Sequence, residues 1–561
     1  MNNKLPAHNN SNDTITLDAL IVGAGFGGLY ALKNLRDKLG LTVRVIDKAG
    51  GVGGTWFWNK YPGALSDTES FSYCYSWDPE LLQEWEITTR YLTQPQILKY
   101  LNHVADRHDL RRNIDLETAL TQARYDEAAA VWDVYTDNGN HFRARYLITA
   151  LGILSASNSP SIPGIEKFKG IVYHTSDWPD NATLAGKKVG VIGTGSTGVQ
   201  VITSIAPIVR HLSVFQRSPQ YSVPIGNGPV DVTYVKNIKE NYSEIWKGIK
   251  NSTFAFGFKE SKKSVFDVDD VTRQQIFEDA WNYGGGFRFV FETFTDIATN
   301  EIANQYAQDF IRKKIAKIVK DPDVARKLTP HDLYAKRPLC DSGYYQTFNR
   351  DNVSLVDIKS TPIVQVTETG VKTSDGVEHE LDVLIFATGF DAVDGNYKCV
   401  DIIGRGGEHI RDHWESGPSS YVSVATSGFP NLFMVLGPNG PFTNIPPTIE
   451  VIVDWITELV KHSENEGYTS VEANLDAESN WTIRCQEIAE QTLYSKADSW
   501  LFGANIPGKK KTVYFYLKGL ASFSEELRFI QENSYQGFSF GTEANATKRT
   551  ATTQIKQGDM A

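Results

Sequence analysis

The clearest chemical signal in the sequence is a glycine-rich stretch that leads to an acid. Gly23, Gly25 and Gly28 form the pattern GxGxxG after the apolar run 17–22, and Asp47 follows a second apolar run about twenty residues further on. Glycines at these places permit a tight turn and let a pyrophosphate approach the backbone, while the following helix offers free N–H groups to the phosphates. A carboxylate at Asp47 can accept hydrogen bonds from a ribose diol. This order of features predicts a dinucleotide site.

The same pattern recurs with a base in place of the acid. Residues 193–198 read GTGSTG, and the positions expected at a cofactor there are Gly193, Gly195, Ser196, Thr197 and Gly198. Arg217 stands where the acid would be. A guanidinium binds a 2′-phosphate through charge-assisted hydrogen bonds, whereas an acid repels it, so the second site is expected to prefer NADPH to NADH. The alternative, a solvated surface arginine, stays open. One site has an acid and the other a base at the position of the ribose. Two such nucleotide sites in one chain suggest a flavoprotein that NADPH reduces.

Composition and charge exclude several classes of function. The 561 residues carry a formal charge of −11 with a pI near 5.6, which argues against a general nucleic-acid binder. The first residues lack the apolar run of a signal peptide, and no apolar stretch reaches the ~18 residues of a membrane span. The four cysteines form no CxxC pair, which argues against a zinc site and a disulfide reductase. A cytoplasmic protein that binds no metal, nucleic acid or membrane is expected, and since nothing requires assembly, a monomer.

Strands and helices that could position the two sites are visible along the chain. The stretches 145–152 and 381–390 each resemble a strand that runs into a small-residue turn, as at crossings between two nucleotide-binding domains. Apolar residues recur at helical spacing in two later segments: Ile302, Tyr306, Phe310, Ile311, Ile315 and Ile318 before Pro322, and Ile452, Trp455, Ile456 and Leu459. Both helical stripes are expected to lie in the core.

Two longer patterns resemble those of flavin-dependent Baeyer–Villiger monooxygenases. The stretch FKGIVYHTSDWP fits the fingerprint FxGxxxHxxxWP through Phe168, Gly170, His174, Trp178 and Pro179. The second pattern joins Gly53-Gly54-Thr55-Trp56 to Tyr61-Pro62-Gly63 and Asp67. The resemblance extends over nearly the whole chain, from about residue 17 to 540.

The resemblance implies an α/β fold with two Rossmann-like dinucleotide-binding domains, for FAD and NADP, and a helical insertion. The FAD-binding domain is expected to comprise residues 17–152 and 390–540, and the NADP-binding domain residues 153–222 and 335–389. The helical insertion would span residues 223–334, and the ends 1–16 and 541–561 would be disordered.

The fingerprint segment 168–179 would link the two domains. Phe168 and Trp178 would anchor it by burial, Gly170 would allow an unusual backbone angle, and Pro179 would fix the exit of the chain. His174 is expected to couple domain position to the redox state of the cofactor. A direct chemical role for His174 is the weaker alternative.

The implied reaction inserts one oxygen atom from O2 next to a ketone carbonyl and yields an ester, or a lactone from a cyclic ketone. NADPH would reduce FAD, and a flavin peroxide anion would attack the carbonyl. Arg337 is the expected catalytic residue, because a guanidinium stays charged and can stabilise both the peroxide and the oxyanion of the adduct. Asp67 would pair with Arg337 and orient it. Since residues 66–69 also fit a helix capping box, a capping role for this segment stays open.

Further residues are assigned by similarity to the family. Thr55, Trp56 and Asp67 are expected at the cofactors, and Ser218 and Lys336 would join Arg217 at the 2′-phosphate. Trp500 resembles a tryptophan on a mobile loop that closes over NADP, with a plain exposed tryptophan as the alternative. The substrate pocket is expected to include Phe442, Thr443, Ile445 and Phe515, although buried aromatics often serve the core alone.

Two other functions stay open. A related flavin monooxygenase could oxidise amine or sulfide heteroatoms, which are nucleophiles that need a protonated peroxide and gain less from Arg337. A non-enzymatic NADP-binding protein would purify colourless and would not take up FAD.

Overall fold

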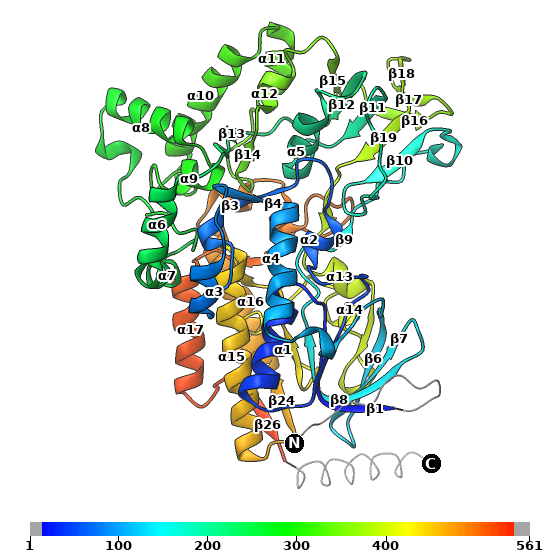
Figure 1. Ribbon diagram of the computed structural model, residues 1–561, viewed down its shortest axis with the longest axis vertical. Coiled ribbons are helices and arrows are strands. Elements are labelled where there is room, and N and C mark those ends of the chain that lie inside the picture. Colours follow the sequence, from blue (N-terminus) through cyan, green and yellow to red (C-terminus); the bar gives the residue numbers. More distant parts are fainter. Residues whose placement is uncertain (1–13, 543–561) are drawn as a thin grey trace.

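The computed structural model describes residues 14–542, and its largest sheet gathers strands from distant parts of the chain (Figure 1). Seven strands follow the spatial order β21-β6-β7-β8-β1-β2-β5, and an eighth, β22, pairs with β8. They are β1 (Ile15–Val22), β2 (Val43–Ile46), β5 (Ile114–Asp115), β6 (Leu120–Asp126), β7 (Val131–Thr136), β8 (His141–Thr149), β21 (Asp401–Ile403) and β22 (Leu432–Met434). Strands β8, β1, β2 and β5 run parallel, as a dinucleotide fold requires.

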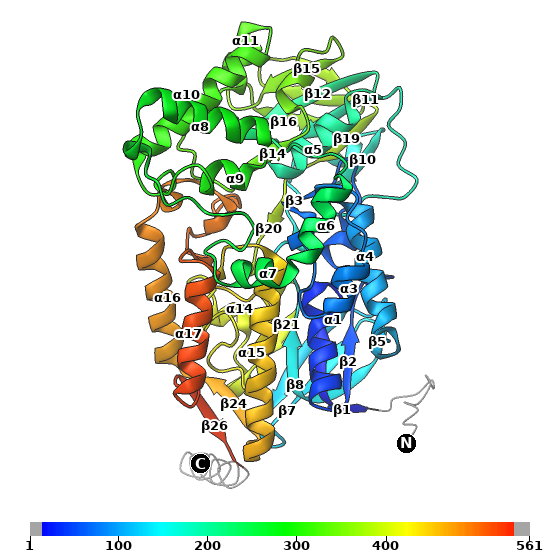
Figure 2. The same cartoon turned by 60° about the vertical axis from the view of Figure 1, so that its left-hand side comes forward.

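A second sheet of five parallel strands lies at the other end of the molecule, in the order β10-β19-β11-β12-β15 (Figures 1 and 2). Its members are β10 (Ile171–His174), β11 (Lys188–Ile192), β12 (His211–Gln216), β15 (Val353–Asp357) and β19 (Val383–Phe386). All four residues of β19 are buried, which fits a parallel strand covered on both faces.

The two sheets are joined by crossing segments that pair with each other. Strand β9 (Ala156–Ser157) follows β8, β20 (Phe390–Asp391) follows β19, and the two run antiparallel. Strand β8 overlaps the stretch 145–152, and β19 lies within 381–390, so the strand predicted in each stretch is confirmed. Figure 1 labels β9, and Figure 2 labels β20, between the two sheets.

The long helix α15 (Ile445–Glu466) packs beside α1 (Phe26–Lys33) in the lower half of Figure 1. On it, the four stripe residues Ile452, Trp455, Ile456 and Leu459 are between 0% and 5% exposed. The predicted core stripe of this helix is therefore confirmed.

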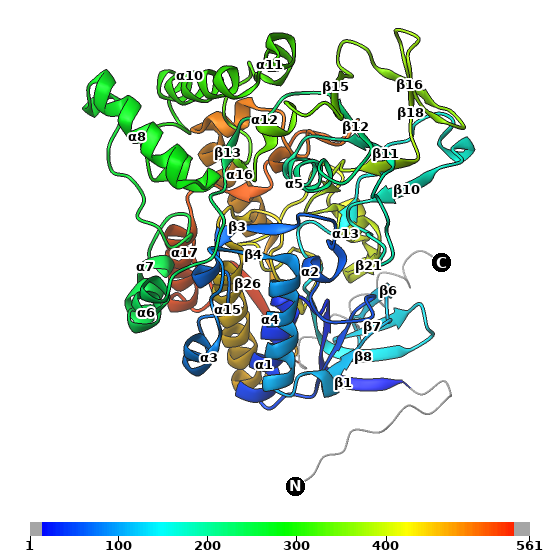
Figure 3. The ribbon, with the colours of Figure 1, turned by 45° about the horizontal axis from the view of Figure 1, so that its top comes forward.

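Helices fill the chain between β13 (Ser222–Pro224) and β14 (Leu339–Asp341), and Figure 3 shows several of them at one side of the molecule. They are α6 (Val232–Glu240), α7 (Tyr242–Lys250), α8 (Asp270–Tyr283), α9 (Gly286–Phe291), α10 (Glu301–Ile318) and α11 (Pro322–Leu328).

Helix α10 forms as predicted, but its apolar stripe is only partly covered. Phe310 is buried among the rings of Phe277 and Phe289. Ile302 is 57% and Tyr306 37% exposed, so the expectation that they lie in the core is wrong. In the first turns the buried face of the helix is formed by Ala303, Asn304 and Ala307, so Ile302 and Tyr306 lie beside it toward solvent. There the Arg273 guanidinium lies 4.0 Å from the centre of the Tyr306 ring.

The outermost residues of the described chain are ordered in strands. Ile15 and Thr16 already pair with β8, and Gly541 ends β26 (Phe538–Gly541), which pairs with β24 (Ser470–Ala473). The predicted disorder of 1–16 and 541–561 is therefore wrong at these inner positions, because backbone pairing holds them. Residues 1–13 and 543–561 lie outside the described part of the chain.

A buried histidine–carboxylate pair makes stability depend on pH. His413 Nε2 lies 3.0 Å from Glu478 Oε1 and His413 Nδ1 3.1 Å from Glu408 Oε1. Burial lowers the pKa of His413, but the two carboxylates outweigh it and raise that pKa above the usual 6.5. Burial likewise raises the pKa of Glu478, yet its hydrogen bonds, from His413 first, bring it below 4.5. The pair therefore stabilises the fold most between about pH 4.5 and 6.5 and loses this contribution as pH rises through the pKa of His413.

His413→Gln is expected to lower the free energy of unfolding by about 2 kcal/mol at pH 6, because it removes a charge-assisted pair. The loss should shrink at pH 9, where His413 is neutral in the parent. Thermal unfolding of both chains at the two pH values measures this. An equal difference at pH 6 and pH 9 would contradict it.

Candidate active site

An ion pair between a partly buried arginine and a buried aspartate joins segments that are far apart in the sequence. Asp67 lies on β3 (Leu65–Glu69), which pairs with β4 (Tyr91–Thr93), and Arg337 lies just before β14. Arg337 Nη1 is 2.6 Å from Asp67 Oδ2, and the Asp67 side chain is 3% exposed. The pairing of Arg337 with Asp67 predicted from the sequence is thus formed.

The environment of Arg337 keeps its charge and limits its movement. Burial lowers the pKa of the guanidinium, but the charge and hydrogen bond of Asp67 outweigh this and raise that pKa. The Phe287 ring supports the group from one side, with its centre 5.1 Å from the Arg337 Cζ. A positive group held between a carboxylate and an aromatic ring can stabilise negative charge on a nearby oxygen.

The segment 66–69 is a strand, so the capping-box interpretation is wrong. Glu69, the residue expected to complete the box, instead accepts ion pairs from Arg90 Nε at 2.6 Å and Arg288 Nη2 at 2.8 Å. A capping box needs a helix that begins at this point, and here strand pairing with β4 takes the backbone instead.

A wall of stacked phenylalanines adjoins Arg337, and the sequence reasoning missed it. Phe287 stacks on Phe256 with ring centres 4.1 Å apart, and Phe254 stacks on Phe291 at 3.6 Å. Phe287 and Phe291 also face each other, 6.3 Å apart, on α9. The signal was present as a high density of phenylalanine in residues 254–258 and 287–294.

The predicted pocket residues gather near this wall. Strand β23 (Gly440–Pro441) pairs with β25 (Phe515–Tyr516), which brings the Phe442 and Phe515 ring centres to 5.6 Å. Phe442 packs against the cores of both halves of the molecule. Thr443 Oγ1 is engaged with Thr448 at 2.5 Å, and half-buried Ile445 begins α15. The structure therefore brings the aromatic pair together but turns the Thr443 hydroxyl to a protein partner.

Trp500 extends the same aromatic group. Its ring lies 5.7 Å from that of Phe515 in an edge-to-face arrangement, and it is half-buried rather than a plain exposed tryptophan. Lys509, further along this segment, pairs with Asp391 and Asp394 next to β20. The segment is thus tied to the crossing between the two sheets.

The first glycine turn has the geometry expected at a dinucleotide. A Cβ on Gly23 would lie 2.3 Å from Ala150 O, so this position needs glycine, and one on Gly25 would make a tight contact of 3.3 Å with Gly54 Cα. Asp47 is buried and accepts backbone N–H groups of Ala24 at 2.6 Å and Ala49 at 2.8 Å. Besides the ribose role predicted for it, Asp47 therefore holds the glycine turn itself.

The second family pattern, residues 53–67, lies between the first glycine turn, which Gly54 contacts, and helix α5 (Ser196–Ile205), which Gly63 contacts. Thr55 and Trp56 begin the short helix α2 (Thr55–Trp58), where Trp56 Nε1 donates to Tyr73 OH at 3.1 Å. Tyr61 OH donates to Gln200 at 2.8 Å, on α5. This hydrogen bond between the second family pattern and α5 was not predicted.

The second glycine turn repeats the first, with one open position. A Cβ on Gly193 would lie 2.4 Å from Ala387 O, and the φ of Gly193 is +112°. Gly195 caps α5, and a Cβ there would meet no protein atom within 4 Å. Ser196 and Thr197 form the first turn of α5.

This difference allows a matched test. Gly195→Ala is expected to unfold close to the parent temperature yet bind NADP⁺ about tenfold or more weakly, since crowding a close contact costs about 1–3 kcal/mol. Gly193→Ala should instead lower the unfolding temperature, because its methyl group strikes the Ala387 carbonyl. Calorimetric titration and thermal unfolding measure both. Unchanged NADP⁺ binding by the Gly195 variant would refute the expectation.

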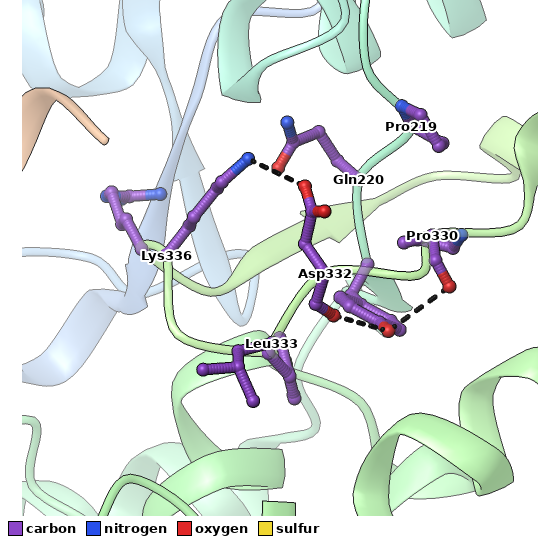
Figure 4. A pocket seen from close by; sticks show the side chains of 9 residues that line it. Pro219, Gln220, Pro330, Asp332, Leu333 and Lys336 are labelled. Atoms are coloured by element: carbon purple, nitrogen blue, oxygen red, sulfur yellow. Dashed lines mark hydrogen bonds and ion pairs between the residues drawn. The ribbon is translucent and has the colours of Figure 1, made fainter. Parts of the chain in front are cut away.

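The candidate phosphate-binding residues lie on facing loops. Arg217 is exposed directly after β12, and Ser218 O accepts from Thr194 Oγ1 at 3.3 Å. Lys336 lines a cleft opposite residues 219–221. Figure 4 shows its amino group extended toward Asp332, with Nζ and Oδ2 3.7 Å apart. The fold thus places Lys336 across from the loop of Arg217 and Ser218.

Comparison with known proteins identifies the family. A model described as pyridine nucleotide-disulphide oxidoreductase matches residues 17–239. Cyclohexanone 1,2-monooxygenase from Acinetobacter sp is 56% identical over 95% of this chain and 98% of its own length. Baeyer-Villiger monooxygenase from Pseudooceanicola batsensis is 54% identical over 92% of this chain and 95% of its own. The chain belongs to the Baeyer–Villiger monooxygenase family.

The family assignment also confirms the fold. The crystal structure of cyclohexanone monooxygenase from Rhodococcus sp. Phi1 bound to NADP⁺ has a TM-score of 0.94 at 54% identity and covers 94% of this chain and 100% of its own. The predicted α/β class with two Rossmann-like units is therefore confirmed. Phenazine N-monooxygenase from Lysobacter antibioticus is 52% identical over 94% of this chain and 97% of its own.

The Baeyer–Villiger fingerprint forms part of a sheet. Residues 171–174 are the edge strand β10, and Trp178 is buried against Tyr173 with ring centres 5.1 Å apart. Phe168 is half-buried. Gly170 has no left-handed backbone angle, so that expectation is wrong; a Cβ there would lie 2.5 Å from Asp382 O. Close packing, not an unusual φ, requires glycine.

His174 bridges the linker and the crossing. Its Nδ1 lies 2.6 Å from Ser176 Oγ, and its Nε2 lies 3.4 Å from both Asn158 O and Thr388 Oγ1. Burial lowers the pKa of His174 below its usual value. A neutral histidine is thus held between the two crossing segments, next to Trp178 and Pro179 in sequence.

Between residues 14 and 542 the structure contains neither a group of metal-ligating side chains nor a membrane-spanning helix. In that range no three His, Cys, Asp or Glu side chains are grouped as a metal ion needs. None of the helices there combines the length and apolar character needed to span a bilayer.

Proposed function

We propose that this chain is a FAD- and NADPH-dependent monooxygenase that uses O2 to convert cyclic ketones into lactones. The observation that carries the proposal is the buried pair of Arg337 with Asp67 beside the phenylalanine wall. The 56% identity to cyclohexanone 1,2-monooxygenase supports the same reaction class.

The two glycine turns fit the proposed cofactors. FAD would lie at the turn of Gly23 to Gly28, bound by residues 17–152 and 390–540, with Thr55 and Trp56 beside it. NADPH would lie at the turn that begins with Gly193, bound by residues 153–222 and 335–389. The open space at Gly195 supports this, because a pyrophosphate needs backbone without a side chain. When bound, FAD and NADPH supply the electrons and the activation of O2.

The protein groups would act on the ketone by charge and exclusion of water. The Arg337 guanidinium would stabilise the negative charge that develops on the carbonyl oxygen when the carbonyl carbon is attacked. Asp67 would hold the guanidinium in place. The wall of Phe254, Phe256 and Phe287 would exclude water and position the ring of the substrate.

Incubation of the purified yellow protein with NADPH, O2 and cyclohexanone tests the proposal. Caprolactone should form in proportion to NADPH consumed, as measured by gas chromatography, and NADH should be a poorer donor. NADPH consumption that yields only hydrogen peroxide across a panel of ketones would refute it. A colourless protein that takes up no FAD would leave only NADP binding.

A second candidate is the oxidation of a heteroatom. The 52% identity to phenazine N-monooxygenase favours it. Nitrogen and sulfur substrates are nucleophiles, so they gain less from a cation that stabilises negative oxygen. If this reading is correct, phenazine or a thioether should outcompete cyclohexanone, and the reaction should survive replacement of Arg337.

The proposal includes a monomer located in the cytoplasm, for which the acidic composition and scattered cysteines are the support. Light scattering after gel filtration tests the monomer, and fractionation of the source cells tests the location.

A further inference from the structure

We propose that Cys340 is a positioning residue that orients Asp67 and, through it, Arg337; this inference rests on the proposed function. Cys340 Sγ donates to Asp67 Oδ1 at 3.1 Å, while Asp67 Oδ2 pairs with Arg337 Nη1 at 2.6 Å. Each carboxylate oxygen therefore has its own partner. Two contacts on opposite oxygens fix the plane of the carboxylate, which one contact would leave free to rotate.

Burial makes this hydrogen bond consequential. Cys340 is 2% exposed and the Asp67 side chain 3%. A buried charged group that loses a donor has a desolvation cost that an exposed group does not have. Burial, followed by the charge of Asp67, raises the pKa of the Cys340 thiol well above its usual range. The thiol therefore stays protonated and can donate.

The strand that carries the thiol packs against the element that supports Arg337. A Cβ on Gly286 would lie 2.7 Å from Leu339 O, directly before Cys340 in the chain. Gly286 begins α9, and the next residue, Phe287, lies under the Arg337 guanidinium. One helix start thus contacts the strand that carries Cys340 and provides the ring below Arg337.

A cavity behind Cys340 shows why the donor cannot be replaced by a small apolar group without consequence. It has a volume of about 240 Å³, and its lining includes Gly63, Gln200, Thr203, Ser204 and Cys340. Polar lining of this kind accommodates water. A shortened apolar side chain at position 340 would open the Asp67 carboxylate to that space and loosen its hold on Arg337.

Three substitutions separate this role from plain core packing. Cys340→Ser keeps an O–H donor in a smaller side chain, Cys340→Val keeps the volume without a donor, and Cys340→Ala keeps neither. The measured quantities are lactone formed per NADPH, hydrogen peroxide per NADPH, KM for NADPH and unfolding temperature. We expect the Val and Ala variants to lose about tenfold in lactone per NADPH and to release peroxide instead, as loss of a buried charged hydrogen bond implies.

The Ser variant is expected to stay within about twofold of the parent, since a hydroxyl replaces the thiol as donor. KM for NADPH should stay unchanged in all three. If the Val variant gives the parent's yield of lactone while the Ser variant does not, the role of Cys340 is packing and the inference is overturned. It is also overturned if all three variants give the parent's yield. Should Ala not fold, Ser and Val decide alone. A parent chain that makes no lactone refutes the proposed function, whereas these two outcomes among the variants refute only the positioning role of Cys340.

Discussion

Replacing Arg337 with alanine is expected to reduce ketone oxygenation at least about a hundredfold, because loss of one oxyanion donor costs roughly 3 kcal/mol. Lysine should restore little of it, since an ammonium lacks the fork that can hold Asp67 and a substrate oxygen together. NADPH oxidation should continue and release hydrogen peroxide. The measurement is the yield of lactone and peroxide per NADPH. Arg484→Ala, which removes an arginine paired with Glu526, is the control and should leave the yield unchanged.

Arg337 also stabilises the fold, so the loss of activity must be separated from unfolding. Removing Arg337 leaves the buried Asp67 charge without its counter-ion, and because Arg337 is 25% exposed the cost is expected to be below the about 3–5 kcal/mol of a fully buried pair. The double variant Arg337→Met with Asp67→Asn removes both charges and should recover much of the unfolding temperature. It should not recover oxygenation. Recovery of both would show that Arg337 acts only on stability and would remove the central argument of the proposed mechanism.

Replacing Arg217 and Lys336 together with alanine is expected to lower kcat/KM for NADPH at least about a hundredfold while leaving that for NADH nearly unchanged. Each charged hydrogen bond to a phosphate contributes about 1.5–3 kcal/mol, and only NADPH carries the 2′-phosphate. Asp332, which lies 3.7 Å from Lys336, would release it to the phosphate. Steady-state kinetics with both nucleotides measure the change.

Arg210→Ala serves as the control, because Arg210 is exposed at the opposite end of the same strand, β12. It should affect neither nucleotide. A double variant that loses NADPH and NADH equally would place Arg217 and Lys336 in general nucleotide binding or folding. A double variant without any change would make Arg217 the solvated surface residue that the sequence also allowed.

What the sequence determined alone is the local geometry that backbone chemistry dictates. Gly23 and Gly193 were predictable because a strand that turns at once into a helix leaves no room for a Cβ, and the structure places a carbonyl oxygen within 2.4 Å of that position in both. Strand β19 and helix α15 were predictable from an apolar run and from helical spacing, because a buried strand or helix face needs apolar side chains at those positions. Asp67 was singled out by a family pattern and Arg337 by the positive charge that the implied reaction needs, whereas their spacing in this chain carried no such information.

Only the tertiary structure decided which distant residues meet and which faces are covered. Cys340 and Asp67 are 273 positions apart, so no local pattern could pair them. Helical spacing placed Tyr306 on an apolar stripe, but in the first turns of α10 the neighbouring core covers Ala303 and Ala307 instead and leaves Tyr306 beside the buried face. Gly170 needs glycine because Asp382 packs against it, not because of its own backbone. Packing between segments that are remote in sequence sets these features, and local sequence patterns do not reveal which segments will pack together.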